Sequence, residues 1–406
     1  MRIIVQKFGG TSVANEEVRK LVVRKVEKVR EQGYSPVVVV SAMGRKGENY
    51  ATDTLIGLAR SANKNIAARE LDHIMYCGEM ISAVIMASTL QASGMDAVML
   101  TGGQAGIITD DQFNRARILK IDPKRISSLV KAGKIPVVCG FQGVTADGEF
   151  TTLGRGGSDT TAAALGAALM AEMIEIYTDV DGIMTADPRM VTNAQILDCI
   201  SYGEVCQLAH QGAKVIHPRA VEIAMQKNIP LMVKSTFSDE PGTLITNISE
   251  GDHGGTIVTD RIATGVTCLN NIAQLRIDVY PEESCTASFE VFKLMADNHI
   301  SVDLINVHPG QIMFTVSGEV VERAAAELQR HGYQAAVTYD CAKVSVVGGG
   351  MREVPGVMAN FVEALAVKHI PILQTVDSHT SISALVKKED VQAAVTALHE
   401  KFGLAG

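Results

Sequence analysis

Residues 7–12, with the sequence KFGGTS, have the types and spacing suited to holding a phosphate group. They follow an apolar run at 3–5, so the motif stands where a strand would end. Adjacent glycines let backbone N–H groups approach a phosphate closely, and Lys7 adds a positive charge. A tight turn between a strand and a helix also requires glycine, so Gly9 and Gly10 alone leave both interpretations open. The chain has no Gly-x-x-x-x-Gly-Lys-Ser/Thr motif, which argues against a P-loop fold.

A second polar motif, residues 154–161 with the sequence GRGGSDTT, opens an alanine-rich helical stretch. The free N–H groups at a helix N-terminus, the guanidinium of Arg155 and the carboxylate of Asp159 would meet there. This composition suits an anionic substrate. A helix N-cap would explain Ser158 or Asp159, but it does not explain Arg155 beside three glycines.

A third motif, residues 177–182 with the sequence YTDVDG, begins where a short apolar run at 174–177 ends, and ADPR follows at 186–189. In open α/β sheets, ligands lie at the carboxyl ends of strands, so these polar residues are placed to bind one. Asp-Gly is also an ordinary turn signal, and that interpretation stays open for 181–182.

The elements that must position these motifs alternate between strand and helix. Residues 2–7 read as a strand, Asn15 caps a helix that ends at Gly33, and 36–41 is an apolar strand with four consecutive valines. This unit predicts a parallel sheet buried on both faces, and the pattern continues to about residue 245 as one three-layer αβα domain of the α/β class. Further apolar runs at 97–100, 135–140 and 174–177 alternate with helical stretches at 80–91 and 159–171.

The last third of the chain contains an internal repeat. Residues 291–316 match 361–386 at an offset of 70, with His299 aligned on His369 and Ile300 on Ile370. With the preceding apolar runs, each copy predicts a ferredoxin-like βαββαβ unit, provided that a last short strand closes it. Two such units favour ligand sensing, and dimerisation is the alternative role. We therefore predict a first domain at 1–245, a linker at 246–262, and small units at 263–337 and 338–406.

Composition excludes several classes of protein. The net charge is −8 with 20% charged residues, so we expect no nucleic-acid or membrane partner, and small ligands instead. The seven cysteines are scattered without a Cys-x-x-Cys pair, and the ten histidines show no metal spacing, so we expect reduced thiols and no metal site formed by these residues. Glu172 and Glu175 interrupt the apolar stretch at 162–176, and no leader is evident, so we expect a soluble, cytoplasmic protein.

Taken together, the motifs resemble those of aspartokinases, members of the amino acid kinase family. The resemblance rests on residues 7–13, Gly78-Glu79, 154–161, 177–182 and 185–189, and it extends over essentially the whole chain. It implies an amino-acid-kinase domain followed by two ACT domains. It also implies ATP-dependent phosphorylation of the side-chain carboxylate of L-aspartate to 4-phospho-L-aspartate, the first step towards lysine and diaminopimelate, threonine and methionine.

The resemblance implies a role for each matching residue. Lys7 would stabilise the transferring γ-phosphoryl group, and Asp159 would orient Lys7 and the substrate. Glu79 would accept the α-ammonium group of aspartate, and Arg155 would hold its α-carboxylate. A carboxylate nucleophile is already ionised at pH 7, so alignment and charge neutralisation by Lys7 and Mg²⁺ suffice without a general base. Further substrate-binding positions would be Ser41, Thr52, Gly156, Gly157 and Ser158, and further ATP-binding positions Phe8, Gly9, Gly10, Thr178, Asp179, Met184, Arg189 and Lys214.

Two segments depart from the family pattern. Met184 stands where the family usually has tyrosine, and residues 280–284 (YPEES) replace a Pro-Gly effector loop that the second unit keeps at 354–356. The chain resembles, in pattern and length, the Bacillus-type aspartokinase inhibited by diaminopimelate; lysine and threonine are the other candidate effectors. Edge strands of the ACT units would pair between chains in a homodimer. The effector contacts implied are Glu283, Ser288, Ser301, Asp303 and Asn306.

Two alternatives remain. The first is another amino acid kinase, acting on glutamate, acetylglutamate or a nucleoside monophosphate, against which the tandem repeats and the pair Glu79 and Arg155 argue. The second is a catalytically inactive ACT sensor, against which the presence of Lys7, Asp159 and Glu79 argues.

Overall fold

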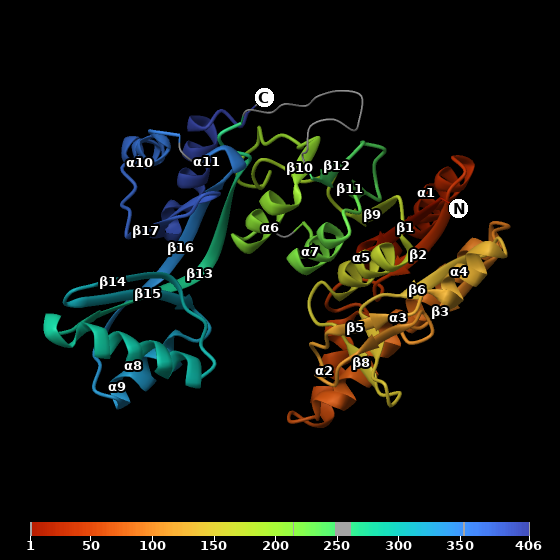
Figure 1. The fold of residues 1–406 in the computed structure, drawn as a ribbon, viewed down its shortest axis with the longest axis horizontal. Coiled ribbons are helices and arrows are strands. Elements are labelled where there is room, and N and C mark those ends of the chain that lie inside the picture. Colours follow the sequence, from red (N-terminus) through yellow and green to blue (C-terminus); the bar gives the residue numbers. More distant parts are fainter. Residues whose placement is uncertain (1, 214, 248–260, 352–353, 406) are drawn as a thin grey trace. The chain divides into compact units, whose positions relative to one another are not determined.

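The computed structural model describes residues 2–213, 215–247, 261–351 and 354–405, and the chain divides into two compact units (Figure 1). Unit 1 consists of Met1–Ile183, Ile196–Ala209 and Lys214–Gly254. Unit 2 consists of Met184–Gln195, His210–Ala213 and Gly255–Gly406. Two short segments from the first 245 residues therefore belong to unit 2. The predicted linker at 246–262 falls largely outside the described residues.

An eight-stranded sheet forms the centre of unit 1 and confirms the predicted, mainly parallel α/β architecture. Neighbouring strands are parallel except β11 (Leu231–Ser235) and β12 (Thr243–Thr246), which are antiparallel. All four valines of the second strand are buried, because helices cover both faces of the sheet. In sheet order the strands are β10 (Cys199–Ser201), β12 (Thr243–Thr246), β11 (Leu231–Ser235), β9 (Met173–Thr178), β1 (Ile3–Phe8), β2 (Ser35–Val40), β6 (Ile135–Cys139) and β3 (Ala97–Leu100).

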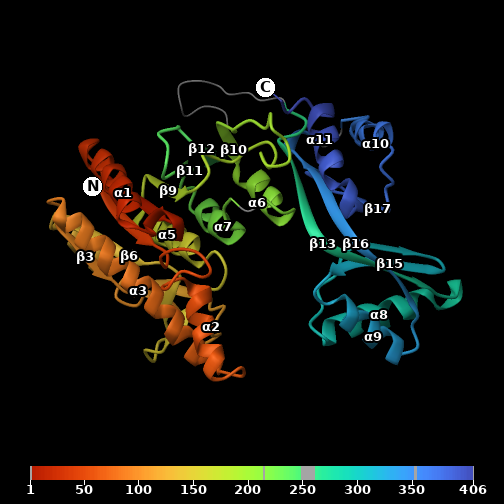
Figure 2. The ribbon, with the colours of Figure 1, turned by 180° about the vertical axis from the view of Figure 1, so that it is seen from behind.

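Helices α1 (Glu16–Glu31) and α3 (Ala68–Ala92) pack side by side over one face of this sheet (Figure 2). Asn15 caps α1 as predicted, since its Oδ1 accepts a hydrogen bond from the N–H of Val18 at 3.0 Å. Helix α5 (Gly157–Leu169) packs against β1 and β9. The other elements of unit 1 are α2 (Thr52–Ala62), α4 (Lys124–Lys131), α6 (Tyr202–His210), α7 (Pro218–Gln226), and a small sheet of β5 (Ile118–Ile121), β4 (Ile107–Thr109), β7 (Gln142–Val144) and β8 (Phe150–Thr152).

Helix α3 is longer than predicted from the sequence. By length and composition it is the one helix among the described residues that is apolar enough to cross a membrane. Half of the 18-residue apolar stretch that meets this criterion is buried inside the protein. The helix also carries the buried side chains of Asp72 and Glu79. These are the features of a core helix.

Unit 2 is built on a six-stranded antiparallel sheet. The first repeat contributes α8 (Ser284–Asp297), β14 (Asp303–His308), β15 (Gln311–Ser317) and α9 (Val321–Arg330). The second contributes α10 (Val357–Val367), β17 (Gln374–Asp377), β18 (Ser381–Lys387) and α11 (Val391–Lys401). The long strands β13 (Gly265–Asp278) and β16 (Ala335–Val347) pair along their length and run through both repeats.

The last strand expected after α11 is not found among the described residues, where only an isolated bridge joins Ala194 and Ala405. The first residues of β13 take its place beside the end of β16, with Gly265 opposite Val347. Strand β16 pairs on its other side with β18. The second repeat therefore completes its sheet with a strand from before the first repeat.

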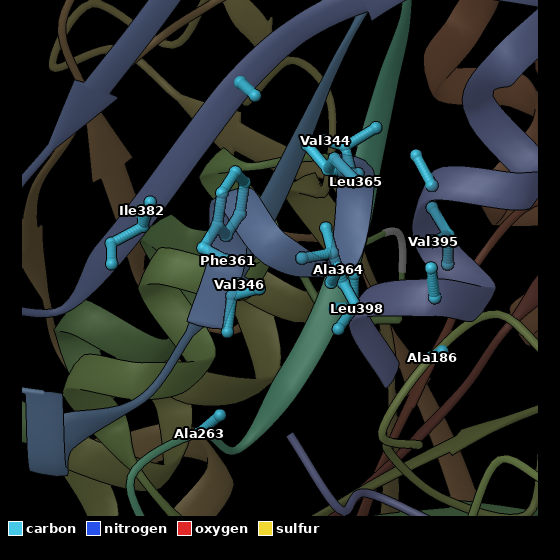
Figure 3. Packing of buried hydrophobic residues seen from close by; sticks show 14 of the residues in the cluster. Ala186, Ala263, Val344, Val346, Phe361, Ala364, Leu365, Ile382, Val395 and Leu398 are labelled. Atoms are coloured by element: carbon cyan, nitrogen blue, oxygen red, sulfur yellow. The ribbon is translucent and has the colours of Figure 1, made fainter. Parts of the chain in front are cut away.

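Each repeat has its own apolar core. The core of the second repeat includes Phe361, Leu365 and Leu398, with Phe361 fully buried (Figure 3). The same cluster contains Ala186 and Val191 from the segment Met184–Gln195. This segment is thus part of the core of unit 2 and not merely attached to its surface.

Phe361→Ala should lower the free energy of unfolding of unit 2 by about 3–5 kcal/mol, because it removes a large ring from a filled core. Val367→Ala is a matched control on the same helix, since Val367 is exposed, and it should change stability by less than about 0.5 kcal/mol. Urea unfolding followed by circular dichroism measures both. Equal effects of the two changes would contradict this description of the core.

Candidate functional site

The pleat of β1 sends successive side chains to opposite faces of the sheet. Phe8 belongs to the core under α1 and α3, where it stacks on Tyr177 at 4.7 Å between ring centroids. Lys7 points to the face covered by α5, and its Nζ lies 2.7 Å from Oδ1 of Asp159. Both side chains are only slightly exposed, so solvent screens this ion pair weakly.

Gly10 is required by close packing after β1. A Cβ at this position would lie 2.7 Å from the carbonyl oxygen of Ala42 and 2.8 Å from that of Gly44. The N–H of Gly44 donates to the carbonyl of Gly10 at 3.0 Å, which ties the two loops together. Gly10 is therefore required by the geometry of the chain after β1, whether or not it also contacts a phosphate. At Gly9, a Cβ would come within 3.5 Å of the ammonium group of Lys7.

The N-terminus of α5 is a glycine-dependent turn. Gly156 has φ of 67°, and a Cβ there would lie about 2.2 Å from the ring of His217. A Cβ on Gly157 would lie 2.5 Å from the ring of Phe141. These contacts fix the first turn, whose N–H groups have no partners within the helix. Arg155 is exposed, and no ion pair to it is found in the described part of the chain.

Glu79 is 2% exposed and comes from the middle of α3. Its Oε1 accepts a hydrogen bond from the N–H of Ala42 at 3.2 Å, whereas Oε2 has no partner among the described residues. Burial raises the pKa of Glu79 to about 8, and the hydrogen bond from Ala42 opposes this only in part. A cation that reaches Oε2 would find a carboxylate with one unused oxygen.

These side chains open onto one cavity of about 450 Å³ in unit 1. Nine predicted catalytic and substrate-binding residues line it: Lys7, Ser41, Thr52, Glu79, Arg155, Gly156, Gly157, Ser158 and Asp159. The sequence analysis missed Asp53, Ile56, Met75, Asn114 and Phe141, which line it too. Of these, Asn114 was accessible from the sequence, because it lies in a polar loop of the kind that follows a strand.

Asp72 braces the rim of this cavity. It is fully buried on α3 and accepts hydrogen bonds from the N–H groups of Asn114 and Thr152, each at 3.0 Å. Arg219 supports the same loop, since it donates to the carbonyl of Leu153 at 2.9 Å. The backbone leading to Arg155 is therefore held from two sides.

The predicted nucleotide positions are divided between the two units. Phe8, Gly9 and Gly10 lie at the carboxyl end of β1, and Thr178 and Asp179 lie at that of β9, the adjacent strand; the N–H of Gly9 donates to the carbonyl of Tyr177 at 3.3 Å. None of these five lines the cavity. Met184 and Arg189 belong to unit 2, and Lys214 lies outside the described residues.

The predicted effector residues lie in or beside the first repeat. Asp303 on the edge strand β14 pairs with the buried ammonium group of Lys343, and Asn306 contacts Gln374. Glu283 and Ser301 are exposed, and the hydroxyl of Ser288 donates to the carbonyl of Ser284 at 2.6 Å.

Metal ligands are not clustered. Within the described ranges no group of three or more His, Cys, Asp or Glu side chains is arranged to hold a metal ion. All seven cysteines are free thiols.

Comparison with known proteins identifies the family. Residues 2–235 match the amino acid kinase family, and residues 336–400 match the ACT domain. The chain is 49% identical to Aspartokinase 1 of Bacillus subtilis (strain 168) over 405 residues, which covers 100% of both chains. The chain belongs to the aspartokinases, within the amino acid kinase family. This confirms the resemblance, the class of enzyme and the fold class expected from the sequence.

Solved aspartokinases share the fold. The crystal structure of E. coli aspartokinase III in complex with aspartate and ADP superposes with a TM-score of 0.78 at 25% identity, covering 98% of this chain and 99% of that one. The complex of the same enzyme with lysine and aspartate gives 0.77 at 26% identity, with the same coverage. As an aspartokinase, the chain is a kinase that uses ATP, and its C-terminal part is regulatory.

Proposed function

We propose that this enzyme transfers the γ-phosphoryl group of ATP to the side-chain carboxylate of L-aspartate, forming 4-phospho-L-aspartate and ADP. The observation that carries the proposal is the cavity in which Lys7, Glu79 and Arg155 converge. A buried carboxylate and a guanidinium suit the two charged ends of an amino acid. The E. coli relative was crystallised with aspartate and ADP, which are a substrate and a product of this reaction.

Lys7 and Asp159 act on the reacting groups. In the transfer, a side-chain oxygen of aspartate forms a bond to the γ-phosphorus, and the bond from that phosphorus to the β,γ-bridging oxygen breaks, leaving ADP with the electron pair. The carboxylate is ionised at neutral pH, so no residue has to remove a proton. Lys7 donates hydrogen bonds to the transferring phosphoryl oxygens, and Asp159 holds its ammonium group in position.

The nucleotide lies at the carboxyl ends of β1 and β9, with its phosphates near Gly9 and Gly10. Thr178, Asp179, Met184, Arg189 and Lys214 are the other proposed contacts. Mg²⁺ accompanies ATP, and phosphate oxygens together with water would supply most of its ligands. Bound there, Mg²⁺ would offset the negative charge of the phosphates.

Regulation is assigned to unit 2. The candidate effectors are diaminopimelate, lysine and threonine, and the effector binds near Glu283, Ser288, Ser301, Asp303 and Asn306. The edge strand β14 exposes Ile305 and Val307, each 46% accessible, which supports a homodimer formed through this edge. The enzyme acts in the cytoplasm, on small molecules and without nucleic-acid or membrane partners.

Lys7→Ala should lower kcat about 10²-fold or more, because it removes a preorganised positive charge from the transition state. Aspartate-dependent release of ADP, with trapping of the acyl phosphate by hydroxylamine, measures the reaction. Lys20→Ala, on the exposed side of α1, is the control and should change kcat by less than about twofold. Activity with glutamate, acetylglutamate or a nucleoside monophosphate but not with aspartate would contradict the proposed function.

Arg155→Lys should raise KM for aspartate about tenfold or more and leave KM for ATP nearly unchanged, because a lysine cannot reproduce a two-pronged contact with a carboxylate. Steady-state kinetics with each substrate varied in turn provides the measurement. Arg69→Lys alters an exposed arginine paired with Glu149 and serves as the control. Equal changes in both KM values would exclude a role confined to aspartate.

The kcat/KM for aspartate should rise between about pH 6.5 and 8.5. Burial raises the pKa of Glu79 to about 8 in the free enzyme, so at neutral pH much of it is protonated, and only the ionised form attracts an ammonium group. Glu79→Gln should lower kcat/KM and remove this rise. The same profile for ATP is the internal control, and an unchanged slope in the variant would refute the assignment.

A further inference from the structure

The chain passes from unit 1 into unit 2 for the segment Met184–Gln195 and then returns to unit 1 at Ile196. Just outside the segment, in unit 1, the N–H of Leu197 donates to the carbonyl of Ile183 at 2.8 Å, so the two ends of the excursion are tied together. The segment lies within the part of the chain that matches the amino acid kinase family, yet it packs in unit 2. It also carries Met184 and Arg189, two of the proposed ATP contacts.

Thr185 is the polar anchor of this segment. It is 2% exposed, and its hydroxyl oxygen accepts a hydrogen bond from the N–H of Gln195 at 3.0 Å. Its backbone is also paired, because its carbonyl accepts from the N–H of Val266 at 2.7 Å and its N–H donates to the carbonyl of Gln195 at 2.9 Å. The hydroxyl lies 2.8 Å from Nε2 of His399 on α11.

His399 is fully buried, and burial lowers the pKa of its ring, which favours the neutral imidazole. A hydroxyl group can both donate and accept, so either Thr185 or Nε2 can supply the hydrogen of this bond. The other ring nitrogen, Nδ1, has no partner among the described residues. Among the described contacts, the ring is thus oriented by a single hydrogen bond, the one to Thr185.

Apolar packing supports the same arrangement. Ala186, next to Thr185, lies in the core of the second repeat together with Leu398, which precedes His399 (Figure 3). A second stretch of the family match, His210–Ala213, is also built into unit 2. A Cβ on Gly212 would lie 2.2 Å from the carbonyl oxygen of Cys268 on β13. Segments that belong to the kinase family by sequence therefore depend on the second repeat for their shape.

We propose that His399 is a positioning residue for the nucleotide: its hydrogen bond to Thr185 fixes the conformation of Met184–Arg189 and thereby sets the affinity for ATP. The proposal rests on the proposed function in one respect, the role of Met184 and Arg189 as nucleotide contacts. It assigns a part in nucleotide binding to a helix of the regulatory unit, from a residue that lies 214 positions away from Thr185 in the sequence.

Thr185→Val and His399→Leu each remove the hydrogen bond while filling similar space. Each should raise KM for ATP, and the dissociation constant of ADP measured by calorimetry, about three- to tenfold, the range expected for one net hydrogen bond. KM for aspartate should stay within about twofold. Because both variants break the same contact, the double variant should be no weaker in ADP binding than the poorer single variant. Thr185→Ser keeps the hydroxyl and should restore wild-type binding.

Val395→Ala is the matched control, because Val395 is buried in the same cluster one turn before His399, and its apolar side chain forms no hydrogen bond to Thr185. It should destabilise unit 2 without changing ADP affinity. An equal rise for Val395→Ala, or unchanged ADP affinity in both folded single variants, would overturn the proposal. If one variant does not fold, the other carries the test. Wild-type enzyme that binds ADP but does not phosphorylate aspartate would refute the proposed function alone, and the ADP comparison would still decide this inference.

Discussion

The ion pair between Lys7 and Asp159 joins the end of the central strand to the start of α5, and the site is arranged around it. It forms because the pleat of β1 commits Phe8 to the core and so commits Lys7 to the opposite face. The parallel register then places the end of β2, with Ser41, beside the end of β1. A one-residue slip of β1 would exchange Lys7 and Phe8 and abolish the ion pair.

Glu79 is subject to a different constraint, because its position on the long helix α3 buries its side chain away from water. An unpaired oxygen on a buried carboxylate is costly, and protonation, which the raised pKa of Glu79 favours, reduces that cost. An ammonium group would restore the charged form and satisfy the free oxygen. The selectivity proposed for this cavity therefore follows from desolvation as much as from the sign of its charges.

Much of this architecture could be predicted from the sequence. The valines of β2, the cap at Asn15 and the glycine motifs fixed the strand and helix order, because each reflects local chemistry and periodicity. The long-range packing was not accessible. Phe141 lines the cavity with a positive φ of 68°, which few phenylalanines adopt. Asp72 joins two stretches of backbone that are 38 residues apart, the loop at Asn114 and the end of β8 at Thr152. Neither feature leaves a periodic signal.

The repeat in the last third was visible, but the way its sheets are shared was not. Because β13 and β16 run through both repeats, the second repeat depends on residues that precede the first. The same dependence extends to Met184–Gln195, whose two alanines and one valine belong to the apolar core that contains Phe361. A domain boundary drawn at residue 245 separates segments that fold together. Since a core tolerates little change in shape, a shift in the second repeat would reach this segment directly. If Met184 and Arg189 contact the nucleotide as proposed, this core within unit 2 would connect the second repeat to nucleotide affinity without a separate pathway.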